Sequence, residues 1–450
     1  MVNRSNDLKK LEAFYSSKES SLTFVYGSKG CEKEQLFVNF AKGKRVFYYH
    51  ARQCSLDKQT DAFCREASDK LGIKPAATDY DKLFDSIALT PDKTVIIIDE
   101  AQYIFKKNSV LFDKLISLKK NNATGLMIII ASSSIVWAEQ DFPELMGNTK
   151  KYFDEFMKLT DLSFLDIVRA FPTYSVADCV ACFGIIGGVN SYLNKWDAKS
   201  NIKKNVCNLI LNTRGELFAE AENFISTELR ELSCYETILS SLAAGNEKLN
   251  DLFEDTGYSR AKISVYLKNL AEFDVVEKVV SFETGGWDNT KKGVYRISNP
   301  FINFWFTFVY PNLSEVYLME PESFYNKYIT PGLNKYLQQY FINVCSEYLQ
   351  LLDMVGQLPI KLERTGTWLG KENNIDIIGQ NSIRENVVGI CNWSDSVMAY
   401  ASYEKLLETM KLARISAKTI YLFSATKFDE KLIELSKENP AVVLVDMTEL

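Results

Sequence analysis

Histidine is nearly absent from this chain, because His50 is the one histidine among 450 residues. Mechanisms that need two histidines, as paired metal ligands or as an acid and a base, are therefore excluded. His50 ends a short apolar and aromatic stretch that begins at Arg45, so we interpret it as the end of a strand.

Long hydrophobic runs are also lacking. No stretch approaches the roughly 18 apolar residues of a membrane-spanning helix, and the run from Phe301 to Tyr310 is interrupted by Asn303 and Thr307. The N-terminal residues contain no apolar signal-peptide core. We therefore expect a cytoplasmic protein with no membrane partner.

Disulfide and metal frameworks are not indicated either. The nine cysteines are odd in number and scattered, which favours reduced thiols. Cys179 and Cys182 have C-x-x-C spacing but no further ligands nearby, so we interpret them as small residues of a buried helix and expect neither zinc nor haem. The net charge of −6 excludes a uniformly basic DNA coat, although one local basic patch remains compatible with it.

Hydrophobic residues make up 46% of the chain and charged residues 24%, as in folded globular proteins, and the length suggests about three domains. The first part contains four short β-branched or aromatic runs separated by helical stretches, of which Lys33–Phe40 is one. Continuous runs of this kind are typical of parallel strands buried on both faces. The predicted strands are Leu22–Tyr26, Arg45–Tyr49, Val95–Ile98 and Leu126–Ala131.

The pattern becomes helical after residue 158. Asn246–Leu270 predicts two short amphipathic helices joined at Thr256–Tyr258, with Ser259 as the cap of the second. The strands Val275–Val280 and Gly293–Ile297 follow around a glycine-rich turn, which is the order of a winged helix.

The last part is predicted to be a smaller α/β domain. It begins after a loose, proline-containing connection from Pro311 to Pro331 and opens with a helix that carries an aromatic stripe from Tyr336 to Tyr348. A later helix runs through Leu406. The predicted strands are Leu362–Arg364, Ile375–Ile378, Val387–Trp393, Thr419–Phe423 and Val442–Val445.

The loop after the first predicted strand has the outline of a phosphate-binding P-loop. Its candidate nucleotide-binding residues are Gly27, Ser28, Lys29, Gly30, Lys33 and Glu34. Gly27 and Lys33 have the required spacing, but Glu32 replaces the second glycine and Glu34 replaces the hydroxyl that would bind Mg²⁺. Because two carboxylates oppose a polyphosphate, we expect the loop shape to persist and binding of ATP or ADP with Mg²⁺ to be weak.

An acidic pair ends the third predicted strand in an intact Walker B pattern. In that setting Asp99 would hold Mg²⁺ and Glu100 would polarise the attacking water. Ser132 lies after the next strand, where such ATPases place a polar sensor of the γ-phosphate. The alternatives are an ordinary acidic strand end and an ordinary serine loop.

The motifs YGSKGCEKEQL, VIIIDEAQYI, IIIASSSIVW, FGIIGGVNSYL and YRISNPFINFWFTFVYPN occur in this order. Together they resemble the prokaryotic and archaeal ATPase family related to AAA and STAND proteins, over nearly the whole chain. The resemblance implies an ATP-dependent switch coupled to a DNA-binding winged helix. It implies a P-loop ATPase-like domain over 1–158, a helical lid-like region over 159–232, a winged helix over 233–312 and a nuclease-like domain over 313–450.

The resemblance also implies a restriction-endonuclease-like, PD-(D/E)XK fold for the C-terminal α/β domain. Such sites gather acids and a lysine around Mg²⁺. Glu347 and Asp376 match two of the acids, but Ile390 replaces the next acid and Asn392 replaces the lysine. We therefore expect no DNA cleavage and, with the altered P-loop, a pseudoenzyme.

The predicted winged helix is the best candidate for a binding surface. Its positions that could contact double-stranded DNA are Ser259, Arg260, Lys262, Tyr266, Lys268, Lys291 and Lys292. The nearby acids Asp251, Glu254 and Asp255 favour the alternative, a protein-docking or packing module. Trp287 fits either an interaction residue or a turn residue.

Three hypotheses for function remain. The preferred one is a weakly nucleotide-binding or non-catalytic switch that binds DNA or an unidentified protein. The second is an active ATPase with an unconventional P-loop that uses Lys33, Asp99 and Glu100. The third is a structural scaffold. Related ATPases often build their site between subunits, so an oligomer is compatible with the sequence.

Overall fold

The structure is a computed structural model that describes residues 4–17, 19–28, 30–88, 93–105, 110–121, 125–228, 231–283, 288–394 and 396–450. The chain divides into two compact units. The first comprises Met1–Asp161 and Val189–Ser191, and the second comprises Leu162–Gly188 and Tyr192–Leu450. Over the described ranges, every helix is too short or too polar to cross a membrane.

The first unit is built on a five-stranded parallel sheet with the strand order β2-β3-β4-β1-β5. The four predicted strands are all present, and every residue of β3 and β4 is buried, as their continuous apolar runs require. The strands are β1 (Ser21–Tyr26), β2 (Arg45–His50), β3 (Thr94–Asp99), β4 (Leu126–Ser132) and β5 (Glu155–Lys158).

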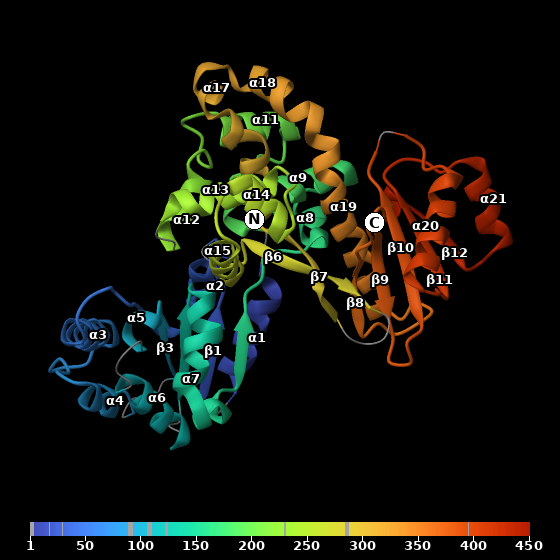
Figure 1. Cartoon of the computed structure of the whole chain (residues 1–450). Coiled ribbons are helices and arrows are strands. Elements are labelled where there is room, and N and C mark those ends of the chain that lie inside the picture. The colour runs from blue at the N-terminus through green and yellow to red at the C-terminus, as the bar shows by residue number, and fades with distance from the viewer. Residues whose placement is uncertain are drawn as a thin grey trace. The chain divides into compact units, whose positions relative to one another are not determined.

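Helices lie on both faces of this sheet, as Figure 1 shows for the blue and cyan part of the chain. Each face has its own hydrophobic core. Phe24, Phe63 and Phe142 belong to one core, and Phe37 and Phe40 of α2 belong to the other. The helices are α1 (Ser5–Ser16), α2 (Lys33–Ala41), α3 (Leu56–Leu71), α4 (Tyr80–Ala88), α5 (Gln102–Phe105), α6 (Val110–Lys120) and α7 (Phe142–Met146). The α/β doubly wound prediction is confirmed.

The second unit begins with helices, as predicted. They are α8 (Phe164–Ala170), α9 (Val176–Ile186), α10 (Asn190–Leu193, which starts in the first unit), α11 (Ile202–Val206), α12 (Glu220–Glu228) and α13 (Leu232–Ala243). Cys179 and Cys182 are buried side chains of α9 and are both free thiols.

A helix pair and a strand pair follow in the predicted order. The helix α14 (Leu249–Thr256) ends at Gly257, whose φ of 69° is the left-handed conformation that favours glycine. The side chain of Ser259 then accepts a hydrogen bond from the Lys262 amide at the start of α15 (Arg260–Glu272). The antiparallel pair β6 (Val276–Phe282) and β7 (Asp288–Ile297) comes next. The predicted glycine-rich turn, with Trp287, lies outside the described residues.

The predicted loose connection from Pro311 to Pro331 is wrong, because this segment is helical. Pro321 and Pro331 each occupy the first turn of a helix, where the missing amide of proline costs no hydrogen bond. The helices are α16 (Pro300–Phe304), α17 (Leu313–Leu318), α18 (Pro321–Phe324) and α19 (Thr330–Met354), with π-helical turns at Trp305–Val309 and Tyr325–Ile329.

The C-terminal sheet is mixed, with the order β12-β11-β10-β9-β8. Strands β10, β11 and β12 are parallel, whereas β9 is antiparallel to both of its neighbours. The predicted first strand is displaced, because β8 begins where the prediction ends. The elements are β8 (Arg364–Trp368), β9 (Ile375–Gln380), β10 (Asn386–Asn392), α20 (Tyr400–Ala413), β11 (Thr419–Ser424), α21 (Glu430–Glu438) and β12 (Val442–Asp446).

Candidate nucleotide site at the carboxyl edge of the parallel sheet

The loop between β1 and α2 keeps a compact turn. The Gly27 amide donates to the Ser132 carbonyl at 3.3 Å, and the Cys31 amide donates to the Ser28 carbonyl at 3.2 Å. Glu32 adopts a φ of 56°, a left-handed conformation that glycine enters without steric cost. A non-glycine residue therefore holds the backbone shape that the second glycine of a P-loop favours. Lys29 lies outside the described residues.

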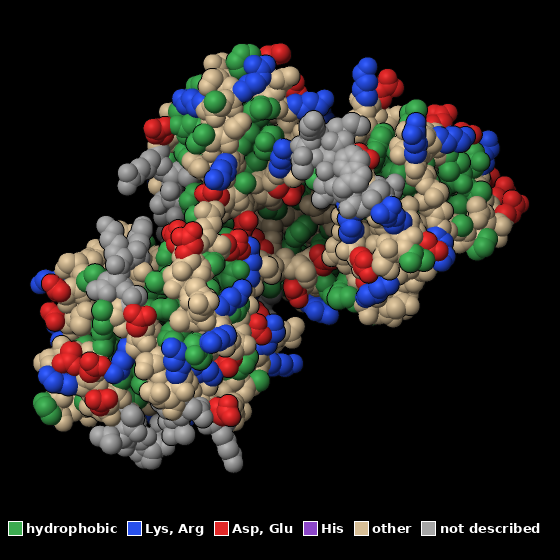
Figure 2. Space-filling model, turned by 60° about the horizontal axis from the view of Figure 1, so that its bottom comes forward, with side chains coloured by type: hydrophobic (Ala, Val, Ile, Leu, Met, Phe, Trp, Pro, Cys, Tyr) green, Lys and Arg blue, Asp and Glu red, His purple; other side chains and the backbone are tan. Residues whose placement is uncertain are grey.

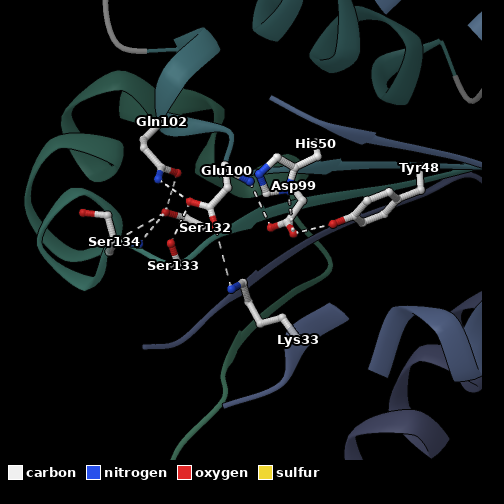
Figure 3. A network of polar contacts seen from close by, with 9 residues as sticks. All are labelled: Lys33, Tyr48, His50, Asp99, Glu100, Gln102, Ser132, Ser133 and Ser134. Atoms are coloured by element: carbon white, nitrogen blue, oxygen red, sulfur yellow. Dashed lines mark hydrogen bonds and ion pairs between the residues drawn. The ribbon is translucent and has the colours of Figure 1, made fainter. Parts of the chain in front are cut away.

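Lys33 points back toward the acids at the end of β3 (Figure 3). Its side chain is 2% exposed, and its Nζ lies 3.9 Å from Oε1 of Glu100. Glu34, one residue further along α2, is exposed. The lysine thus pairs with a carboxylate of its own chain, and the carboxylate that replaces the Mg²⁺-binding hydroxyl faces solvent.

Both carboxylate oxygens of Asp99 accept hydrogen bonds from the protein. The Tyr48 hydroxyl donates to Oδ2 at 2.7 Å, and the Glu100 amide donates to Oδ1 at 2.9 Å. Nδ1 of His50 lies 3.8 Å from Oδ2. Burial raises the pKa of Asp99, against the opposing effects of Lys33 and of the Tyr48 hydrogen bond. Burial, followed by the charge of Asp99, raises the pKa of Tyr48 as well.

Glu100 is held by a second set of polar side chains. Oε2 accepts hydrogen bonds from Nε2 of Gln102 at 2.5 Å and from the Ser133 hydroxyl at 2.6 Å. The Ser132 hydroxyl is buried and donates to Oε1 of Gln102 at 2.8 Å. Figure 3 shows these residues around Glu100, whereas Tyr48 and His50 approach Asp99. The structure therefore brings Lys33, Asp99, Glu100 and Ser132 together at one edge of the sheet.

Several residues of this network were not predicted as site residues from the sequence. Tyr48 and His50 stand on β2, where His50 pairs with Asp99 in the register of the two strands. The strand order makes them neighbours of the acids, and the sequence predicted the parallel strands without their order. Gln102 follows directly after the Walker B pattern, and Ser133 follows Ser132. Outside this network, Nδ2 of Asn190 donates to Oε2 of Glu32 in the phosphate loop at 2.7 Å, a contact that the sequence did not predict.

The residues at the position of the Mg²⁺ ion that a P-loop site implies differ from the usual set at one place. Each oxygen of Asp99 accepts one hydrogen bond from the protein and keeps a further lone pair, whereas Glu34 stands in place of a hydroxyl ligand. Among the described residues, no group of three or more His, Cys, Asp or Glu side chains is arranged to hold a metal ion.

The predicted DNA-contact residues have mixed environments. Arg260 and Lys268 are exposed, but Arg260 lies over the ring of Phe253 and donates to Asn250, and Lys268 pairs with Glu272 at 3.6 Å. Lys262 lies 4.2 Å from the centre of the Tyr258 ring. The side chains of Lys291 and Lys292 lie outside the described residues.

Tyr266, the aromatic residue among the predicted DNA contacts, faces the interior of the protein. Its side chain is 9% exposed, its ring stacks edge-on against Tyr235, and its hydroxyl donates to Glu231. Tyr266 therefore occupies the inward face of α15. On the face of the molecule in Figure 2, acidic and basic side chains are interspersed over the described surface.

The predicted nuclease residues take part in internal contacts. The Glu347 carboxylate accepts hydrogen bonds from the Phe164 and Leu165 amides at 3.0 and 3.2 Å, at the N-terminus of α8. Asp376 accepts one from the Cys391 amide at 2.9 Å, and burial raises the pKa of Asp376 to about 6. Asn392 donates to the Ser396 carbonyl, and Ile390 is half-buried.

Comparison with known proteins gives matches along most of the chain. One relative is an uncharacterized protein of Methanocaldococcus jannaschii, which is 26% identical over 405 residues. The alignment covers 88% of this chain and 88% of the relative. Among solved structures, a Walker-type ATPase of Pyrococcus abyssi aligns with a TM-score of 0.47 and 15% identity, over 68% of this chain and 96% of that one. The ORC2 protein of Aeropyrum pernix, solved in complexes with ADPNP and ADP, aligns with a TM-score of 0.42 and 12% identity. This alignment covers 70% of this chain and 94% of the ORC2 chain.

Two family models match separate parts of the sequence. Residues 1–196 match an ATPase domain that is predominantly from Archaea, and residues 305–409 match a family of archaeal and bacterial proteins of unknown function. The first match contains the parallel sheet with the Lys33, Asp99 and Glu100 cluster. The chain therefore carries an ATPase domain of the family found predominantly in Archaea, joined to the C-terminal domain of archaeal and bacterial proteins of unknown function.

Proposed function

We propose that the first unit is a weakly nucleotide-binding, non-catalytic switch module of the ATPase family. The observation that carries this proposal is that neighbouring protein groups already contact the side chains that would bind nucleotide and metal ion. Lys33 is buried against Glu100, and both oxygens of Asp99 accept protein hydrogen bonds.

Binding of a triphosphate would alter these contacts. Lys33 would leave Glu100, and a metal ion at Asp99 would share an oxygen with the Tyr48 hydroxyl. Glu32 and Glu34 add two carboxylates beside the position of the phosphates, where like charges oppose each other strongly at short range. These terms act in the same direction, so they favour weak binding and slow turnover.

The test is calorimetric titration of MgATP and MgADP into the wild type and into the Glu32→Gly, Glu34→Thr double variant. We expect the double variant to bind at least about ten-fold more tightly, which corresponds to about 1.4 kcal/mol. Asp69→Asn with Glu144→Gln is the matched control, because it removes two exposed acids of the same unit. Tight binding and turnover by the wild type would instead establish the active-ATPase hypothesis.

The second candidate function is DNA binding through α15. It is supported by the exposure of Arg260 and Lys268 on a helix that follows a short turn, as in helix-turn-helix proteins. We expect fluorescence anisotropy with a duplex DNA to show affinity that falls steeply with salt, because phosphate contacts release counterions. The Arg260→Ala, Lys268→Ala variant should flatten the salt dependence, and Lys405→Ala should leave it unchanged. Absence of duplex binding at low salt would favour the scaffold hypothesis.

A further inference from the structure

The tripeptide Val189–Ser191 belongs to the first unit, although the residues before and after it belong to the second. It packs directly on the phosphate loop. The Ser191 amide donates to the Gly30 carbonyl at 3.2 Å, and a Cβ added to Gly30 would lie only 3.0 Å from side-chain atoms of Val189 and Ser191. The side chain of Asn190 also reaches the loop, where its Nδ2 donates to Oε2 of Glu32.

We propose that Asn190 is a latch that holds Glu32 across the phosphate loop, so that a polyphosphate enters only when this contact opens. The proposal rests on the proposed function, because it assigns a regulatory contact to the same loop. The bond joins a charged acceptor to an amide that is 4% exposed, and hydrogen bonds to charged groups are the stronger ones.

The latch is poised to open because Asn190 is only partly satisfied. Its Oδ1 is buried and has no hydrogen-bond partner among the described residues. A buried acceptor without a donor is unfavourable, and opening would expose this oxygen to water or to a donor group of a ligand. The same side chain therefore closes the loop with one atom and favours release with the other.

The latch segment is also connected to residues outside the first unit. Gly188 and Tyr192 flank the tripeptide and belong to the second unit. Opening of the latch therefore moves a segment that is covalently joined to the second unit on both sides.

Cys31 provides a measurement of opening that needs no nucleotide. It precedes Glu32 in the loop and is fully buried, whereas Cys54 is the exposed cysteine among the described residues. In a Cys54→Ser background, the rate of Cys31 alkylation, followed by peptide mass spectrometry, reports how often the loop opens. We expect Asn190→Ala to raise this rate about ten-fold, the change that loss of a charge-assisted hydrogen bond produces. Asn194→Ala is the matched control, because it makes the same replacement at an exposed position just after α10.

A double-variant cycle decides whether the effect runs through Glu32. Asn190→Ala should have almost no effect in a Glu32→Gly background. Asn190→Asp preserves the size of the side chain and should also open the loop, by repelling Glu32. An unchanged Cys31 rate in both Asn190 variants, or an equal effect with and without Glu32, would overturn the latch.

Titration with inorganic tripolyphosphate separates this inference from the proposed function. We expect Asn190→Ala to bind tripolyphosphate about ten-fold more tightly than the wild type and Asn194→Ala to match the wild type. Tight MgATP binding by the wild type would refute the proposed function alone. A gain of affinity in Glu32→Gly with none in Asn190→Ala would refute the latch alone.

Discussion

Asp376 should make the C-terminal domain less stable as the pH rises. Asp376 is half-buried in β9, and removal of its carboxyl group from water raises its pKa from 3.8 to about 6, although the Cys391 amide and Arg296 act in the opposite direction. Between these two pH values the native chain holds a proton that the unfolded chain has lost. The free energy of unfolding therefore decreases with rising pH over this window, by about 3 kcal/mol in total.

The Asp376→Asn variant tests this reasoning. Asparagine keeps a carbonyl oxygen for the Cys391 amide but removes the buried charge. We expect the variant to match the wild type at pH 4 and to be more stable by about 2–3 kcal/mol at pH 7.5. Urea unfolding at several pH values, followed by near-ultraviolet circular dichroism, measures the difference.

The matched control is Glu434→Gln, which neutralises an exposed acid of α21 in the same domain. Its stability should follow that of the wild type at each pH. If Asp376→Asn and the wild type differ by the same amount at pH 4 and pH 7.5, Asp376 does not titrate in this window and the reasoning fails.

Three further predictions concern side chains engaged inside the protein. Replacement of Glu347 by alanine should lower the free energy of unfolding by about 2–4 kcal/mol, because two amides of α8 lose a charged acceptor, and Glu347→Gln should lower it less in the same urea assay. Tyr48→Phe should lower the free energy of unfolding by about 1–2 kcal/mol. Because this variant also raises the pKa of Asp99 further, the decrease should be larger at pH 8 than at pH 5. Lys33→Ala should leave MgATP affinity nearly unchanged in calorimetry but destabilise the first unit by about 3 kcal/mol, because Glu100 loses its cation; a large loss of affinity would favour the active ATPase.

The sequence predicts the central sheet well because its strands carry a strong signal. Val95–Ile98 is a continuous β-branched run, which is unusual outside a strand that is covered on both faces. The edge strand β5 was missed, because Glu155 and Lys158 flank only two apolar residues and its burial is incomplete. Such a strand forms because β1 offers it unpaired backbone groups, which is tertiary information.

The candidate site is harder to predict because its contacts are long-range. Glu32 and Asn190 are 158 positions apart, and no local pattern joins them. The direction of a side chain on a helix is also difficult to predict from the sequence. Tyr266 shares α15 with exposed cations, but the packing of Tyr235 fixes its position on the inward face.

The candidate nucleotide site and the candidate nuclease site share one physical feature, and this feature determines which substitutions could restore activity. In metal-dependent hydrolases the charge of the carboxylates at the active site is balanced by the bound metal ion. In this chain the balance comes from the protein, through the Tyr48 hydroxyl at Asp99, the Cys391 amide at Asp376 and two amides of α8 at Glu347. Reinstating a missing residue would then be insufficient, because the remaining acids are still committed to internal donors. We therefore expect Asn392→Lys with Ile390→Glu to leave DNA uncut, since Glu347 would have to abandon α8 before it could bind a metal ion.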